Sequence, residues 1–211
     1  MSHDDFKFEP VRGLPEALPE GEVILWQGAP SPRRLARDAL KLNWVIGYFV
    51  LLTVWRVGVS STEFPLTEAM GHGAPFLVIG ALCCLLILGL ATIQAKATVY
   101  TLTNKRVAMR VGAALTMTLN LPYVQINNAA LDLKRSGHGT LAFELIGDVR
   151  FSYLMTWPHV RPWYFSKTQP CFRSIPEAEK VAAIFADAAE ARVNEPRVEK
   201  IAAPVSAVAA E

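Results

Sequence analysis

Two stretches of the chain, residues 42–59 and 74–95, are apolar almost throughout. Each approaches the roughly 20 apolar residues that an α-helix needs to cross the hydrocarbon core of a bilayer. The second stretch carries no charged residue, and Arg56 in the first lies near enough to its end for the guanidinium to reach the interface. This pattern predicts two transmembrane helices joined by a loop at residues 60–73.

Beyond residue 96, apolar and polar positions alternate with the period of two that is typical of β-strands. The expected strands are, in order, "VYTLT", "VAMRV", "LTMTLNL", one on each side of the Gly137–Gly139 turn, and "VRFSYLM". A helix should follow Pro176, with four apolar residues on one face: Val181, Ile184, Phe185 and Ala188. This order resembles a pleckstrin-homology-like (PH-like) barrel. The expected fold is therefore two transmembrane helices followed by a PH-like antiparallel β-barrel with a C-terminal helix.

The remaining segments complete the expected domain organisation. Residues 1–41 form a Pro-rich cytoplasmic leader, which ends in a basic juxtamembrane helix starting at Ser31. Within the leader, "EVILWQG" is either a short strand or an interfacial anchor. Residues 96–192 make up the cytoplasmic PH-like domain, and residues 193–211 are expected to be a flexible tail.

Positive charges flank both apolar stretches. Those before the first stretch are Arg33, Arg34, Arg37 and Lys41. Those after the second that we expect near the lipid are Lys105, Arg106 and Arg110. Because cationic segments stay on the cytoplasmic side, we expect a two-pass inner-membrane protein with both termini in the cytoplasm. The juxtamembrane cations either fix this topology alone or also contact anionic lipid or an acidic partner. The net charge of +2 is too small to suggest nucleic-acid binding.

No arrangement of residues in the sequence supports catalysis or metal binding. A nucleophile elbow, a phosphate loop, paired carboxylates and a Cys/His cluster are all missing, so neither an enzyme nor a cofactor is expected. In the second apolar stretch, Gly80 and Cys84 form a small-xxx-small pair. Such a pair either admits a neighbouring helix or simply faces lipid.

The segment "WPHVRPWYF", residues 157–165, is unusually rich in aromatic residues for a loop. Its two prolines keep it out of a central strand. Trp, Tyr and Arg are the residue types that anchor protein interfaces. The candidate partner-binding residues are therefore Trp157, His159, Arg161, Trp163 and Tyr164. The alternative is that the rings fold inward and complete the core of a small barrel.

Several motifs together resemble a known family. The order of "ILWQGAPSP", two hydrophobic helices and "YTLTNKRV" at the start of a β domain resembles the bacterial membrane-anchored PH-domain proteins. More narrowly, "GLPEALPEGEVILWQG", "TLNLPYVQI" and "WPHVRPW" resemble the reaction-centre assembly factors of purple bacteria within that family. The likeness extends over residues 8–190.

The resemblance implies a non-enzymatic factor without a cofactor, which helps the photosynthetic reaction centre and the reaction-centre–light-harvesting 1 complex to assemble in the cytoplasmic or intracytoplasmic membrane. Its partners would be reaction-centre subunits, light-harvesting 1 assembly intermediates and membrane lipids. The fold also implies an alternative, a lipid-binding module with a basic pocket formed by Lys105, Arg106, Arg110, Lys134 and Arg135. Homodimerisation is a further alternative, because two membrane spans bury little surface without a partner.

Overall fold

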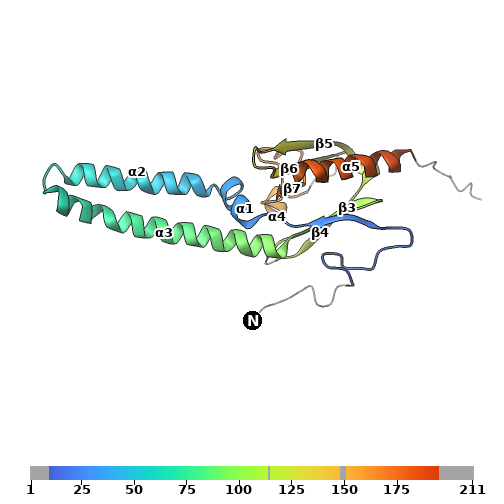
Figure 1. Cartoon of the computed structure of the whole chain (residues 1–211), viewed down its shortest axis with the longest axis horizontal. Coiled ribbons are helices and arrows are strands. Elements are labelled where there is room, and N and C mark those ends of the chain that lie inside the picture. The colour runs from blue at the N-terminus through green and yellow to red at the C-terminus, as the bar shows by residue number, and fades with distance from the viewer. Residues whose placement is uncertain (1–9, 114, 148–150, 195–211) are drawn as a thin grey trace, which may run out of the picture.

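The computed structural model describes residues 10–113, 115–147 and 151–194. A long helical hairpin and a β domain lie end to end along the long axis of the molecule (Figure 1). The hairpin consists of α2 (Leu42–Ser60) and α3 (Leu66–Ala97). In the most apolar 18-residue segment of each helix, only 6% of α2 and 11% of α3 is buried inside the molecule. A core helix of a soluble domain would be mostly buried. Both are candidate membrane spans by length and composition.

The second apolar helix begins earlier than the hydrophobic pattern predicts. α3 starts at Leu66 rather than at Ala74, so helix replaces most of the expected loop and residues 61–65 make the connection. A Cβ added at Gly73 would lie 2.7 Å from the side chain of Val57, so this glycine lets α3 pack closely on α2. The packing extends the helix into a polar sequence that hydropathy alone does not identify as helical.

The small residues of α3 face other helices of the same chain. Gly80 is buried against Phe49 of α2, where an added Cβ would lie 2.8 Å from that side chain. Cys84 packs against the buried cluster formed by Leu42, Ala91 and Ala36 of α1 (Pro32–Asp38). Within the chain, Gly80 therefore packs on α2, and Cys84 lies at the edge of the cluster that joins α1, the start of α2 and α3.

The β domain contains two antiparallel sheets, with strand orders β1-β2-β3-β4 and β5-β6-β7. The strands are β1 Ile24–Gly28, β2 Val99–Thr103, β3 Arg106–Val111, β4 Met117–Pro122, β5 Ile126–Leu133, β6 Gly139–Leu145 and β7 Cys171–Ile175. A short 3-10 helix, Tyr123–Gln125, joins the two sheets, and α5 (Ala178–Val193) follows β7. Two long apolar helices, antiparallel sheets and a C-terminal helix confirm the expected fold class.

The leader is not a separate segment, because part of it belongs to the first sheet. β1 lies within "EVILWQG" and pairs with β2, with Trp26 opposite Leu102. The segment is therefore a strand, and the boundary expected between the leader and the domain at residues 96–192 does not hold. Edge pairing with β2 supplies the backbone partners that a short strand lacks on its own.

One expected strand is replaced by a helix, one observed strand was not expected, and the expected tail lies outside the described residues. The described part of "VRFSYLM" contains α4 (Tyr153–Thr156) in place of a strand. β7 was not expected, because Arg173 lies on the same face as Cys171 and Ile175, so polar and apolar residues do not alternate along the strand. The expected flexible tail falls almost entirely on residues 195–211, which lie outside the described ranges.

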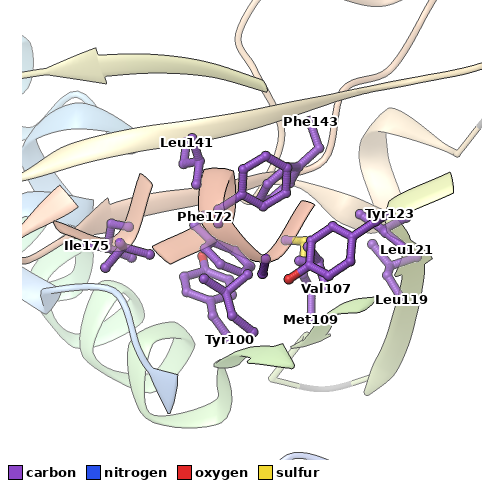
Figure 2. Close-up of a cluster of buried hydrophobic side chains, with 14 of the residues drawn as sticks. Tyr100, Val107, Met109, Leu119, Leu121, Tyr123, Leu141, Phe143, Phe172 and Ile175 are labelled. Carbon is purple, nitrogen blue, oxygen red and sulfur yellow. The ribbon is translucent and has the colours of Figure 1, made fainter. Parts of the chain in front are cut away.

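The core lies between the two sheets and contacts α5 (Figure 2). The Phe172 ring from β7 stacks on Tyr100 from β2 at a centroid distance of 4.5 Å, and meets Phe143 from β6 edge-on at 5.1 Å. The predicted apolar face of the last helix packs on this cluster: Val181, Phe185 and Ala188 are buried and Ile184 is half-buried. Aromatic packing between sheets thus fixes the domain as one unit.

α1 connects the helical hairpin to the β domain. Its Ala36 is fully buried against α3, beside Ala91. At the other side of α1, the Arg173 guanidinium of β7 donates from Nη2 to the carbonyl oxygen of Asp38 at 3.2 Å. The junction between the two parts is therefore built from packing and hydrogen bonds rather than from a free linker.

Candidate functional site

The aromatic segment lies at the end of the β domain that faces the helical hairpin. His159 Nε2 lies 3.1 Å from Oγ1 of Thr98, the residue at the C-terminus of α3. His159 is only 1% exposed, so its side chain offers no surface to a partner. Its assignment as a partner-binding residue was wrong, because the imidazole is the buried anchor of the segment.

A chain of hydrogen bonds holds this anchor in place. The Arg173 backbone N–H donates to the Tyr100 hydroxyl oxygen at 3.2 Å, and that hydroxyl lies 2.5 Å from His159 Nδ1. The Thr98 hydroxyl donates to the Gln94 carbonyl at 2.7 Å. Each hydroxyl has one proton to donate, so Tyr100 donates to Nδ1 and the Nε2–H of a neutral His159 donates to Thr98.

Burial keeps this network uncharged. Desolvation, followed by the nearby Arg173 charge, lowers the pKa of His159 from 6.5 to about 3. Burial also raises the pKa of Tyr100 well above its usual range, so its hydroxyl stays protonated. The network thus joins β2, β7 and the end of α3 by neutral hydrogen bonds at physiological pH.

Around the anchor, six large apolar or aromatic side chains point outward and form what we name the aromatic face: Leu154, Met155, Trp157, Trp163, Tyr164 and Phe165. Leu154 is 86% exposed and Trp163 is 82% exposed. The rings of Tyr153 and Phe165 lie 4.6 Å apart, and those of Trp163 and Phe165 lie 6.2 Å apart. These rings pack on one another at the surface and do not complete the core.

Arg161 and Trp163 are held in defined positions on this face. Arg161 Cζ lies 4.3 Å from the centroid of the Tyr164 ring, and its Nη1 donates to Gln169 Oε1 at 3.0 Å. Trp163 has a φ of +70°, which is a left-handed conformation that bulky residues rarely adopt. Strained backbone of this kind gathers at functional segments.

Sequence reasoning missed two members of the aromatic face, because Leu154 and Met155 were assigned to a strand. Phe165 belongs to the aromatic segment that the sequence identified, although it was not among the candidate partner-binding residues. The signal available was the unbroken apolar run "YLM" directly before "TWP", which carries more exposed apolar surface than a polar connection normally has.

The expected basic residues divide between the two ends of the β domain. Arg33, Arg37 and Lys41 are exposed beside the start of α2, and Arg34 is half-buried. Lys105 and Arg106 instead lie at the β2–β3 turn. β2 leads from the end of α3 to this turn over five residues, which at about 3.3 Å per residue is roughly 17 Å. The turn therefore points away from the hairpin, and the expectation that it contacts lipid was wrong.

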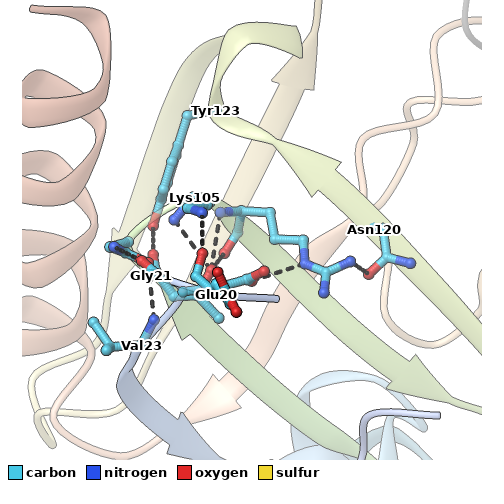
Figure 3. Close-up of polar contacts among 10 residues, drawn as sticks. Glu20, Gly21, Val23, Lys105, Asn120 and Tyr123 are labelled. Carbon is cyan, nitrogen blue, oxygen red and sulfur yellow. Dashed lines mark hydrogen bonds and ion pairs between the residues drawn. The ribbon is translucent and has the colours of Figure 1, made fainter. Parts of the chain in front are cut away.

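The leader binds both cations of the β2–β3 turn, one through a carboxylate and one through a backbone carbonyl. Arg106 Nε donates to Glu22 Oε1 at 2.9 Å, and the Glu22 side chain is only 3% exposed. Lys105 Nζ donates to the carbonyl oxygen of Glu20 at 3.0 Å (Figure 3). The side chain of Asn104 also bonds to this loop, accepting from the Val23 N–H and donating to the Gly21 carbonyl. We name this set of contacts the leader clasp.

Arg110 also differs from expectation. It pairs with Val99 and so lies at the end of the sheet nearest α3, but it is only 6% exposed and faces no lipid. The basic pocket expected from Lys105, Arg106, Arg110, Lys134 and Arg135 is therefore not formed. Its members lie at opposite ends of the domain, and one of them is inside it.

The described residues contain no group of three or more His, Cys, Asp or Glu side chains placed to hold a metal ion. Cys171 is fully buried, and desolvation raises the pKa of its thiol to about 12. A thiol with this pKa is a poor nucleophile at neutral pH. The aromatic segment presents Trp, Tyr and Arg side chains, which are the types that anchor protein interfaces.

Comparison with known proteins places these features in context. Residues 44–189 match the family described as "Bacterial PH domain". The chain is 46% identical over 211 residues to an uncharacterized 23.7 kDa protein in the puhA 5′ region of Rhodobacter capsulatus, and the match covers 99% of this chain and 98% of that protein. No solved structure matches the chain significantly.

Proposed function

We propose, from the premise that this chain belongs to the bacterial PH-domain family, that it is a non-enzymatic assembly factor for the photosynthetic reaction centre, of the PuhB type. The place of its relative beside puhA supports a link to photosynthesis. In this role it holds reaction-centre subunits and light-harvesting 1 assembly intermediates at the membrane. The two apolar helices anchor it in the inner membrane, with both termini in the cytoplasm.

The aromatic face is the observation that carries this proposal. It presents six large apolar or aromatic side chains on a domain that has a complete core without them. Exposing that much apolar surface to water costs free energy, which burial against a partner recovers. Trp, Tyr and Arg also occur together there, as they do at the energetic centres of protein interfaces.

The position of the aromatic face suits a membrane-bound partner. The anchor of the segment, His159, bonds to Thr98 at the end of α3, so the face lies close to where the hairpin leaves the bilayer. A subunit inserted beside α2 and α3 would reach this face with its own membrane-proximal residues. The helical hairpin and the aromatic face can then hold one partner at two points, which raises its effective concentration.

A mild-detergent pull-down from photosynthetically grown membranes tests the proposal. The tagged wild-type chain should recover reaction-centre subunits or partly pigmented intermediates, identified by mass spectrometry and absorbance spectra. The Trp163→Ala variant should stay folded, since the ring is 82% exposed, but should recover roughly tenfold less. Val124→Ala, at an exposed position outside the aromatic face, is the matched control and should behave as wild type.

Two outcomes would count against the proposal. Recovery of the tagged chain alone, from membranes where the complex is being made, would contradict stable docking. Equal recovery by the wild-type and Trp163→Ala proteins would contradict docking through the aromatic face. A variant that unfolds or is degraded would show that this ring has a structural role.

A further inference from the structure

A cavity lies at the junction between the helical hairpin and the β domain, and we name it the junction groove. Its volume is about 520 Å³, and it opens between the start of α2, the outer side of β5 and β6, and the aromatic segment. Five cationic side chains line it: Arg37, Lys41, Lys134, Arg161 and Arg173. They come from four separate parts of the chain, and only the fold brings them together.

The charges around the junction groove do not balance. Its lining includes two carboxylates, Asp38 and Asp132, against the five cations, which leaves an excess of three positive charges. Asp132 is also engaged, since it pairs with Lys134 Nζ at 2.8 Å. A cavity with walls of low dielectric and a surplus of one sign attracts the opposite charge.

Arg173 is the most informative of these cations because it is only 7% exposed. Its guanidinium donates to three carbonyl oxygens, those of Pro158 at 3.3 Å, Val160 at 2.9 Å and Asp38 at 3.2 Å. Within the described part of the chain it forms no ion pair. A buried cation held only by neutral acceptors keeps its charge uncompensated, and an anion in the adjoining cavity would stabilise it.

A second, apolar groove continues from the first along α2. It has a volume of about 430 Å³ and is lined by Asn43, Trp44, Gly47, Tyr48 and Leu51. Asn43 and Trp44 line both cavities, so the cationic and apolar parts are adjacent. A cationic cavity at the end of a membrane-length helix, joined to an apolar groove along that helix, matches a molecule with an anionic head and a hydrocarbon tail.

We propose that the junction groove binds the headgroup of an anionic phospholipid, whose acyl chain lies in the apolar groove of α2. Arg guanidinium groups recognise phosphate by paired charge-assisted hydrogen bonds, and Lys41 adds a point charge at the rim. The lipid bridges the hairpin and the β domain, and so fixes the aromatic face at one height above the membrane. The site requires an apolar environment around α2, either bilayer or detergent, and its occupancy can be measured without any assembly partner.

Native mass spectrometry of the full-length chain in mild detergent tests this site. The chain is titrated with phosphatidylglycerol and, separately, with phosphatidylcholine of the same acyl chains. Wild type should retain phosphatidylglycerol preferentially, and the Arg37→Gln/Lys41→Gln double variant should bind it roughly tenfold more weakly. Arg33→Gln/Arg135→Gln makes the same change in net charge with two residues that do not line the groove, and should bind as wild type.

A third variant tests the tail separately. A Cβ added at Gly47 would meet no atom within 4 Å, so Gly47→Leu fills the apolar groove without a clash inside the chain. This variant should bind phosphatidylglycerol roughly tenfold more weakly. The thermal stability of the detergent-solubilised chain without added lipid should be unchanged.

Three results would overturn the proposal. Equal retention of phosphatidylcholine would show that the charge surplus selects nothing, and equal weakening by the Arg33→Gln/Arg135→Gln control would indicate diffuse surface charge. Full displacement of the lipid by millimolar inorganic phosphate, with no effect of Gly47→Leu, would identify a free-anion site. Because the purified chain is used without any reaction-centre subunit, failure here leaves the pull-down result for the assembly role intact.

Discussion

The two ends of the β domain both gather cations, and they use them in different ways. At the end far from the membrane helices, Lys105 and Arg106 are engaged by the leader clasp, where a buried carboxylate and a carbonyl oxygen accept their hydrogen bonds. At the end near the helices, Arg161 and Arg173 bond only to neutral groups and line a cavity. Arg106 is thus paired with a carboxylate and Lys105 stays partly exposed to water, whereas the buried Arg173 has charge left for a ligand.

The difference shows that counting cations near a membrane span does not identify a lipid site. Lys105 and Arg106 are closer in sequence to the end of α3 than Arg161 and Arg173 are, yet the direction of β2 carries them away from the bilayer. What separates Arg106 from Arg173 is that the buried Glu22 carboxylate pairs with the first, whereas no carboxylate in the described part of the chain forms an ion pair with the second. Three substitutions and a change in pH should affect the two ends of the domain to different extents.

The largest effect should come from Arg173→Met at the end near the helices. The substitution leaves three carbonyl oxygens without their donor and removes one of the hydrogen bonds between β7 and the end of α1. We expect a loss of about 3 kcal/mol in unfolding free energy, since hydrogen bonds to charged groups are the stronger kind. Chemical unfolding in detergent measures it. A loss under about 1 kcal/mol would show that the guanidinium is not part of the junction.

Acid should weaken the same end of the domain. The pKa of His159 is about 3 when folded and about 6.5 when exposed, so between these values the unfolded chain binds more protons. The contribution of His159 to the free energy of unfolding should therefore be fully present above about pH 6.5. It should decrease as the pH falls, by about 2 kcal/mol at pH 5. Unfolding midpoints measured from pH 7.5 to 5 check this. A His159→Gln variant should lack this part of the pH dependence, and an unchanged slope in that variant would contradict the assignment.

A smaller effect should follow from opening the leader clasp. Arg106→Ala leaves the buried Glu22 carboxylate without its ion pair, which should cost about 1 to 2 kcal/mol. Glu22→Gln should cost less, because the amide can still accept a hydrogen bond from Arg106. Neither change should alter phosphatidylglycerol binding. Reduced lipid binding in Arg106→Ala would mean that the two ends of the domain are not independent.

The smallest effect should come from Lys105→Ala. Lys105 is partly exposed and donates only to one backbone carbonyl, so its loss should change stability by less than about 0.5 kcal/mol. Thermal unfolding beside the Arg106→Ala protein gives the comparison directly. An effect as large as that of Arg106→Ala would show that the clasp depends on both cations equally.

The sequence predicted the elements in which polar and apolar residue types alternate. Alternation located β2, β3, β5 and β6, and helical periodicity located α5 with its buried Val181 and Phe185. Burial does not decide the outcome, because all five residues are buried in β2 as well as in β7. Alternation failed at β7 because Arg173 shares a face with Cys171 and Ile175, so residue type does not alternate along that strand. The hydrophobic pattern also failed at the start of α3, because residues 66–73 are helical but more polar than the span that hydropathy identifies.

For the site, composition identified the right segment but not the direction of its side chains. "WPHVRPWYF" was recognisable from its aromatic content, yet His159 turns inward and Trp163 turns outward. Alternate orientation of this kind depends on contacts with Thr98 and Tyr100, which are about 60 residues away in sequence. Arg173 was missed for a related reason. A single cation inside an apolar strand indicates an internal hydrogen-bond network only once the fold shows its acceptors.

Site-specific photocrosslinking tests whether a reaction-centre subunit docks on the aromatic face. A photoreactive residue placed at Phe165, which is 61% exposed, should crosslink a reaction-centre subunit in membranes where the complex is being assembled. The same residue at Val124, which is 46% exposed and lies outside the aromatic face, should not. Crosslinks from position 165 only to lipid, or equal subunit crosslinks from both positions, would contradict docking of a partner on the aromatic face.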